Sequence, residues 1–216
     1  MDVFIIGISG GVGRLLARSL QARGDRVHGL VRREQYRADL ASWGALAHVG
    51  DLASMTAREL ATAFGTAGTV VYSAGSNGGS KEVTDAIDHR GVVKAIEAAR
   101  LAGAPGLALV SVLPEAGRGQ GMSEEEEYYF AVKKKAEMAL TRSGLDWLIL
   151  RPSMLTDGPG TGRVSLGPAE SHDEVSREDV AATLAELLHE PRISRQILEL
   201  NTGSTPLGEA VRANTR

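Results

Sequence analysis

The sequence of 216 residues contains no cysteine. Disulfide bonds, thiolate metal sites and cysteine nucleophiles are therefore excluded. The five histidines are scattered along the chain, and none belongs to an HExxH motif or a similar pair. We therefore expect no metal site.

The chain also lacks a strong charge of either sign and a long apolar run. Its net charge is −3 at pH 7, whereas binding to nucleic acid needs a concentrated basic surface. No apolar stretch approaches the length that spans a membrane, and Met1-Asp2 leads directly into strand-like residues rather than a signal peptide. We therefore expect a cytoplasmic protein with neither a nucleic-acid nor a membrane partner.

The composition is that of a globular protein, with 43% hydrophobic and 24% charged residues. The length predicts one domain, residues 1–216, without room for a large separate substrate domain. Apolar strand-like runs alternate with helical patterns, which predicts an α/β fold: a doubly wound, Rossmann-type parallel sheet with helices on both faces. The expected strands are 3–7, 27–31, 45–49, 69–73, 107–112, 146–150 and 196–200, and the expected helices lie near 13–23, 57–64, 82–101, 124–142 and 177–189.

A glycine-rich segment, GISGGVG at residues 7–13, joins the first apolar run to an amphipathic stretch. In a strand-to-helix turn, glycines allow a tight bend, close approach of the backbone to a pyrophosphate, and close packing of the helix on the strand. The first amides of the helix then face the phosphates. The segment predicts a dinucleotide site at Gly7, Ser9, Gly10, Gly11, Val12 and Gly13; a tight turn without a ligand is the alternative.

Two arginines stand at the end of the second apolar run, about 20 positions after the glycines. An acidic residue there would bind the 2′-hydroxyl of NAD, whereas an arginine accommodates the 2′-phosphate of NADP. Because a guanidinium can bind phosphate oxygens in a fork, Arg32 and Arg33 favour NADP(H) over NAD(H). Glu34 works against this interpretation, and two surface arginines are the alternative to it.

These features resemble the atypical short-chain dehydrogenases/reductases, in particular the compact NAD(P)H-binding group of NmrA-like and biliverdin reductase B-like proteins. The resemblance covers nearly the whole chain and is carried by GISGGVG, LVRR, Gly50-Asp51-Leu52, Ser73-Ala74-Gly75, SGLDWLILRP at 143–152 and VSREDV at 175–180. In that family the GDL segment lies against the adenine, and the SAG segment passes the ribose and phosphates. The resemblance therefore implies cofactor contacts at Asp51, Leu52, Ala74 and Gly75.

The same resemblance suggests where chemistry takes place. Tyr129 and Lys133 have the YxxxK spacing of the broader superfamily, and residues four apart share one helix face. In that superfamily the lysine holds the nicotinamide ribose and lowers the tyrosine pKa, so that the tyrosine can exchange a proton with the substrate oxygen, which a serine also binds. This implies catalytic roles for Tyr129, Lys133 and Ser111, with Lys133 also binding the cofactor. The alternative is structural: a packed tyrosine, and a lysine solvated like its two neighbours.

The expected function is NADPH-dependent reduction of a small carbonyl or similarly polarised substrate. Two alternatives stay open: a non-catalytic NAD(P)H-sensing regulator of NmrA-like type, and an NAD-dependent epimerase or dehydratase. The arginine pair and the short region after Pro152 disfavour the epimerase. Loops 113–128 and 152–175 are expected to shape the substrate pocket, and a helix such as 82–101 could pair two copies into a homo-oligomer.

Overall fold

A mixed, mostly parallel sheet forms the centre of the protein, whose computed structural model describes residues 1–76, 79–113 and 121–215. The strand order is β11-β8-β10-β6-β5-β4-β1-β2-β3. Neighbours from β3 to β10 are parallel, whereas β8 is antiparallel to β10 and β11. The strands are β1 (Asp2–Ile6), β2 (Arg26–Val31), β3 (Leu46–Val49), β4 (Thr69–Tyr72), β5 (Gly106–Val110), β6 (Asp146–Pro152), β8 (Arg163–Gly167), β10 (Gln196–Thr202) and β11 (Thr205–Pro206).

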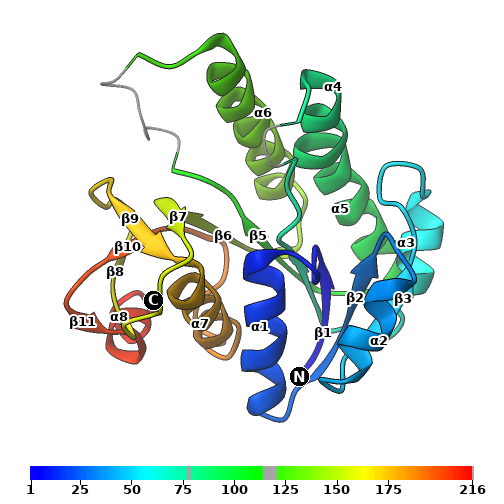
Figure 1. Ribbon diagram of the computed structural model, residues 1–216, viewed down its shortest axis with the longest axis horizontal. Helices are drawn as coiled ribbons and strands as arrows, with labels where there is room; N and C mark the ends of the chain where they lie inside the picture. The colour runs from blue at the N-terminus through cyan, green and yellow to red at the C-terminus, as the bar shows by residue number, and fades with distance from the viewer. Residues whose placement is uncertain (77–78, 114–120, 216) are drawn as a thin grey trace.

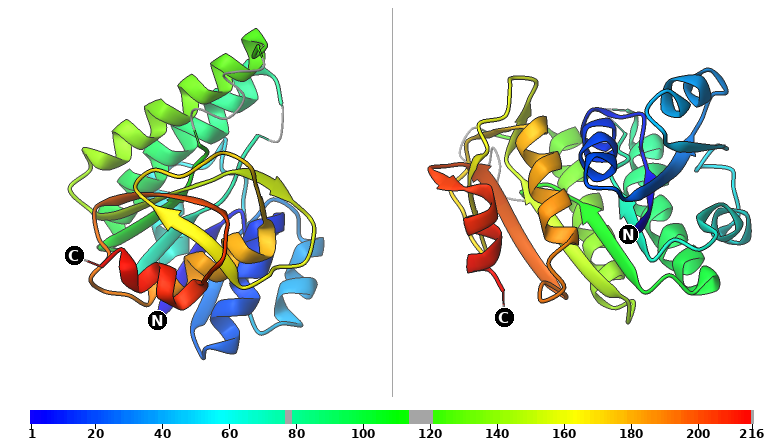
Figure 2. Two further views of the ribbon diagram at one scale, coloured as in Figure 1. Left: turned by 90° about the vertical axis from the view of Figure 1, so that its left-hand side faces the viewer. Right: turned by 90° about the horizontal axis from the view of Figure 1, so that it is seen from below.

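Helices cover both faces of this sheet (Figure 1; Figure 2, left). One face carries α1 (Gly11–Ala22), α2 (Gln35–Ala41), α7 (Arg177–Leu188) and α8 (Leu207–Ala213). The other carries α3 (Ala57–Phe64), α5 (Gly91–Ala102) and α6 (Glu124–Thr141), and α5 continues from α4 (Lys81–Thr84) through a π-helical turn, η1 (Asp85–Arg90). The predicted Rossmann-type fold is confirmed.

The first strand shows why this sequence folds into layers. Successive side chains of a strand point to opposite faces; Val3 and Ile5 belong to the core beneath α1 and α7, and Phe4 and Ile6 to the core beneath α3 and α5. All four are buried. A strand covered on both faces reads as a continuous apolar run, which is what made the central strands predictable.

The region after Pro152 differs from the expectation of a loop at 152–175. It contains β7 (Met154–Thr156), β8 and the start of β9 (Glu174–Ser176), and β7 pairs with β9 in a separate small sheet. β7 and β9 have three residues each, too few for an alternation of apolar and polar residues to be recognised, whereas residues 163–166 of β8 do alternate. They are held by pairing to segments that are distant in the sequence. Of the other expected loop, 113–128, residues 114–120 lie outside the described residues, and 124–128 already belong to α6.

The strand order reverses between β1 and β4, because the chain builds outward from β1 to β3 on one side and from β4 to β6 on the other. In open α/β sheets, ligands bind beyond the carboxyl ends of the strands at such a switch point. The fold thus directs attention to the turns that follow β1 and β4. No helix within the described ranges is both long and apolar enough to cross a membrane.

Candidate active site

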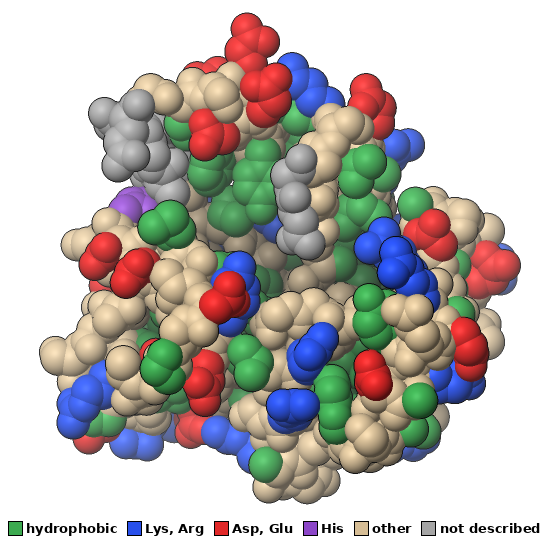
Figure 3. Space-filling view, viewed as in Figure 1, with side chains coloured by type: hydrophobic (Ala, Val, Ile, Leu, Met, Phe, Trp, Pro, Cys, Tyr) green, Lys and Arg blue, Asp and Glu red, His purple; other side chains and the backbone are tan. Residues whose placement is uncertain are grey.

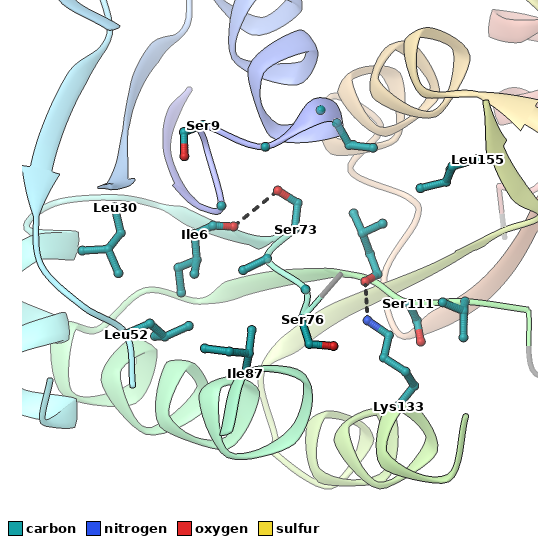
Figure 4. A pocket seen from close by; sticks show the side chains of 18 of the residues that line it. Ile6, Ser9, Leu30, Leu52, Ser73, Ser76, Ile87, Ser111, Lys133 and Leu155 are labelled. Carbon is teal, nitrogen blue, oxygen red and sulfur yellow. Dashed lines mark hydrogen bonds between the residues drawn. The ribbon is translucent and has the colours of Figure 1, made fainter. Parts of the chain in front are cut away.

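A cavity of about 350 Å³ lies at this switch point. Figure 4 shows it as an elongated space, with Leu30 and Leu52 at one end, Lys133 and Ser111 at the other, and Ser9 of the glycine turn along one wall. In the space-filling view the same face is hollowed between α1 and the helices α4 and α6, and hydrophobic side chains are visible in the hollow (Figure 3). The site is therefore long enough to have two chemically different ends.

Most of the site residues predicted from the sequence line this one cavity. They are Gly7, Ser9, Gly10, Gly11, Val12, Arg32, Asp51, Leu52, Ala74, Gly75, Ser111, Tyr129 and Lys133. Two predicted residues, Gly13 and Arg33, do not line it. The fold thus brings together residues that are spread over more than half of the chain, whereas their individual roles stay predictions.

Two glycines of the turn are required by the fold itself. Gly7 has φ +91°, and a β-carbon there would lie 2.6 Å from the backbone nitrogen of Ala74. A β-carbon on Gly13 would lie 2.2 Å from the carbonyl oxygen of Gly7. Gly13 therefore lets α1 pack against the β1 turn, as expected, without reaching the cavity.

The middle pair of glycines leaves the start of α1 open. Gly10 caps the helix without a side-chain hydrogen bond, so the first amides of α1 are not covered by a capping side chain. A β-carbon on Gly10 would lie 3.1 Å from the Gly7 oxygen, a contact that a small shift can relieve, whereas one on Gly11 would lie 2.7 Å from Cδ of Arg177. Helix amides without a capping side chain fit the phosphates of a dinucleotide.

The adenosine end carries Arg32, which is exposed and lines the cavity directly after β2. Arg33 is exposed and does not line the cavity. Glu34 forms an ion pair with Arg37, 2.6 Å between its Oε1 and the arginine Nε, and it does not line the cavity. The Glu34 carboxylate, whose charge would disfavour a 2′-phosphate, is thus paired with Arg37.

The other end of the cavity holds the predicted catalytic set. Ser111 follows β5, its side chain is buried with 3% of its surface exposed, and its hydroxyl oxygen has no hydrogen-bond partner among the described residues. A buried hydroxyl without a partner is costly, and it is satisfied when a ligand atom binds to it. Tyr129 is partly buried on α6, one helical turn before Lys133.

Lys133 is buried, unlike the two lysines that follow it. Its Nζ donates to Oδ1 of Asp88 at 3.3 Å and to the Val110 carbonyl oxygen at 3.4 Å. The other carboxylate oxygen of Asp88 accepts the Ser76 N–H at 3.0 Å. The interpretation of Lys133 as an ordinary solvated lysine is therefore wrong.

Asp88 itself was not predicted from the sequence. It lies on η1, its side chain is fully buried, and η1 packs against α6. The signal available in the sequence was an aspartate on the same helical stripe as Val92, Ala95 and Ile96, which are buried. Short π-helical turns occur frequently at functional sites, and this one brings a carboxylate next to the predicted lysine.

The pKa of Tyr129 is raised, not lowered as the superfamily comparison implied. Burial of the phenol is the larger cause, and the negative charge of Asp88 adds to it. Lys133 does not offset these effects, because its ammonium group is paired with Asp88. Tyr129 therefore keeps its proton at neutral pH, and it is a weaker acid than a free tyrosine.

The remaining lining of the cavity is mainly apolar. Side chains from η1, α4, β7 and the segment after β5 contribute, and sequence reasoning missed them: Val83, Ile87, Val112 and Leu155. From the predicted substrate loop 152–175, Leu155 of β7 is the one residue in the described lining. No group of three or more histidine, aspartate and glutamate side chains in the described ranges could hold a metal ion.

Comparison with known proteins places this geometry in a family. The profile of a family described as NAD(P)H-binding matches residues 7–191. A Bacillus subtilis protein named Uncharacterized sugar epimerase YhfK is 34% identical over 214 residues, which cover 98% of this chain and 99% of its own.

Solved structures agree with the profile. A Bacillus halodurans protein whose name refers to NAD-dependent epimerases/dehydratases superposes with a TM-score of 0.90 at 30% identity, covering 99% of both chains. ChuY, described as an anaerobillin reductase of Escherichia coli O157:H7, has a TM-score of 0.77 at 28% identity, covering 94% of this chain and 97% of its own. The chain therefore belongs to the NAD(P)H-binding family, among relatives of the atypical short-chain dehydrogenase/reductase and epimerase type.

Proposed function

We propose that this protein is an NADPH-dependent reductase of a small carbonyl or similarly polarised substrate. The observation that carries the proposal is the buried, unpartnered hydroxyl of Ser111 at the Tyr129 end of the dinucleotide cavity. The name of the Escherichia coli relative, a reductase, supports the same reaction type. Arg32 supports NADPH over NADH.

The cavity residues fit the cofactor in a definite order. Arg32 lies where the 2′-phosphate is expected, the amides of Gly10 and Gly11 where the pyrophosphate is expected, and Lys133 near the nicotinamide ribose. When bound, NADPH supplies the hydride. The rest of the chemistry belongs to the chain: Ser111 and Tyr129 donate hydrogen bonds to the substrate oxygen, and Tyr129 transfers its proton to that oxygen as negative charge develops on it.

At neutral pH Tyr129 carries the proton that a reduction must deliver to the substrate oxygen. Burial and the charge of Asp88 raise its pKa, so the proton moves only as hydride transfer makes that oxygen strongly basic. The apolar walls and the pairing of Lys133 with Asp88 also leave the reactive end without a free charge among its described residues. This favours a small uncharged substrate over a sugar nucleotide.

The test is NADPH oxidation against a panel of carbonyls, quinones and flavins, with Tyr129→Phe and a matched control, Tyr128→Phe. Both changes remove one hydroxyl from adjacent residues of α6, but Tyr128 does not line the cavity. We expect Tyr129→Phe to lower the rate by roughly 10²–10⁴ with NADPH affinity nearly unchanged, and Tyr128→Phe to retain most of the activity.

An active wild type with an unaffected Tyr129→Phe variant would remove the tyrosine from the mechanism. Tight NADPH binding without turnover on the panel would favour the sensor, and the partner would then be sought by pull-down with and without NADPH. Tight retention of NAD with no net oxidation of NADPH would favour the epimerase, the activity in the name of the Bacillus subtilis relative.

A further inference from the structure

Arg177 is a cation in a position that its own helix does not favour. It is the first residue of α7, and Ser176 already caps that helix by accepting the Asp179 N–H at 2.9 Å. A positive charge in the first turn opposes the helix dipole, which favours anions at this end. Neither capping nor the dipole explains an arginine here.

The side chain of Arg177 lies across the start of a different helix. Helices α7 and α1 pack side by side (Figure 1), and Cδ and Nε of Arg177 come within 2.7 Å and 3.1 Å of where a β-carbon on Gly11 would be. The absence of a side chain at Gly11 thus makes room for the arginine. Both residues line the dinucleotide cavity next to Gly10.

Arg177 is held by a partner from which it can be released. Its Nη1 donates to Oδ1 of Asp157 at 2.7 Å, and the Asp157 side chain is 91% exposed. Ion pairs with an exposed carboxylate contribute little to stability, whereas an arginine binds phosphate oxygens in a strong, two-pronged contact. An anion at the start of α1 would therefore compete successfully for this guanidinium.

The other positively charged residues of the cavity lie away from the glycine turn. Among the described lining residues, the positively charged ones are Arg32, Lys133 and Arg177. Arg32 follows β2 at the adenosine end, and Lys133 is paired with the buried Asp88. Arg177 is the one whose stem touches the glycine turn, where the pyrophosphate of a dinucleotide is expected.

We propose that Arg177 clamps the pyrophosphate of the bound nucleotide against the start of α1, and that Asp157 competes with the nucleotide for the arginine. The proposal rests on dinucleotide binding in the proposed function. It assigns a role to the segment 175–180, which carried the family resemblance without a function of its own.

Calorimetry with four ligands separates this clamp from the 2′-phosphate site. NADPH, NADH and ADP-ribose all contain the pyrophosphate, and 2′-AMP does not. In Arg177→Met, which keeps an unbranched apolar stem over Gly11, we expect the affinity for the first three to fall about tenfold or more, with the NADPH/NADH ratio and 2′-AMP affinity unchanged. Arg177→Lys, which keeps the charge but not the fork, should fall in between.

Two further variants act as controls with distinct signatures. Arg32→Ala should lower the affinity for NADPH and 2′-AMP but not for NADH. Asp157→Asn removes the competing carboxylate and should raise the affinity for NADPH and NADH alike, by up to about fivefold. Circular dichroism and thermal unfolding establish that each variant is folded.

The clamp is refuted if folded Arg177→Met binds NADPH and ADP-ribose as tightly as the wild type, or if it loses affinity for 2′-AMP to the same extent. An Asp157→Asn variant that binds more weakly refutes the competition. Failure of dinucleotide binding itself has a different signature, because the wild type would then bind neither NADPH nor NADH, and failure of the reductase activity alone would leave these affinities unchanged.

Discussion

Replacing Lys133 by methionine tests the buried pair that organises the reactive end of the cavity. The change keeps an unbranched side chain but removes the ammonium group that lies 3.3 Å from Asp88. The Asp88 side chain is 0% exposed, so the carboxylate would be left with the Ser76 N–H as its remaining donor among the described residues.

The expected destabilisation is large. Removing one partner of a buried ion pair costs about 3–5 kcal/mol, because the other charge is left uncompensated. For a chain of this length, 1 kcal/mol lowers Tm by about 2–4 °C, so Lys133→Met should unfold roughly 6–20 °C below the wild type. Lys134→Met is the matched control: Lys134 is the next residue of α6 but is exposed, and its replacement should change stability by less than about 0.5 kcal/mol.

A double-mutant cycle, followed by urea unfolding, isolates the pair from the rest of the helix. Asp88→Asn should also destabilise the protein. The double variant should lose less free energy of unfolding than the two single variants lose together, by about 1–3 kcal/mol. A Lys133→Met protein within about 0.5 kcal/mol of the wild type, or a cycle without coupling, would refute the buried pair. A loss of activity in Lys133→Met is informative only under conditions where the variant is folded.

Three further predictions concern the cofactor end and the distant edge of the sheet. Gly10→Val should abolish NADPH binding in calorimetry while its circular dichroism spectrum stays native. Gly13→Val should instead impair folding, since its β-carbon would lie 2.2 Å from a backbone oxygen. Normal NADPH binding by Gly10→Val would mean that the nucleotide binds elsewhere. The wild type should bind NADPH at least about tenfold more tightly than NADH, and Arg32→Ala should remove most of this preference; equal affinities in the wild type would contradict the assignment. Burial lowers the pKa of His28 despite the opposing charge of Asp2, and burial also lowers the pKa of the neighbouring His48. The unfolded chain therefore binds protons more readily than the folded one, and the free energy of unfolding should fall as the pH drops below about 6.5. Urea unfolding between pH 8 and 5 should show this fall, and a smaller fall in His28→Gln; an identical pH profile for both proteins would exclude His28 as its source.

The architecture was predictable because its signals are local. Strands buried on both faces read as apolar runs, and the glycine turn combines a strand, a tight bend and a helix start within a dozen residues. The capping box at the start of α6 is a local feature of the same kind, because Ser123 and Glu126 stand three residues apart. Such features need no knowledge of distant segments.

The site was less predictable because its decisive contacts are not local. The YxxxK spacing singles out Lys133 from its two neighbours, but its burial and its pairing with Asp88 arise only when α6 packs against η1. The π-helical turn that carries Asp88 leaves no obvious pattern in the sequence. The raised pKa of Tyr129 depends first on burial of its phenol and then on the charge of Asp88, and both arise only from the packing of distant segments. Arg177 likewise meets Gly11 only after α7 packs on α1.

The π-helical turn also has a consequence for how the chain tolerates change in length. A π turn holds one more residue than an α-helical turn, so deleting a single residue between Asp85 and Arg90 would let α4 and α5 join as one regular helix. A wide and a regular turn both close one circle about the helix axis, so α4 and α5 would keep their angular register after the deletion. Val83 of α4 would still face the cavity, whereas Asp88 lies inside the wide turn and would lose its present position. One residue in this turn therefore sets the local placement of the carboxylate next to Lys133, without changing how the two flanking helices face their neighbours.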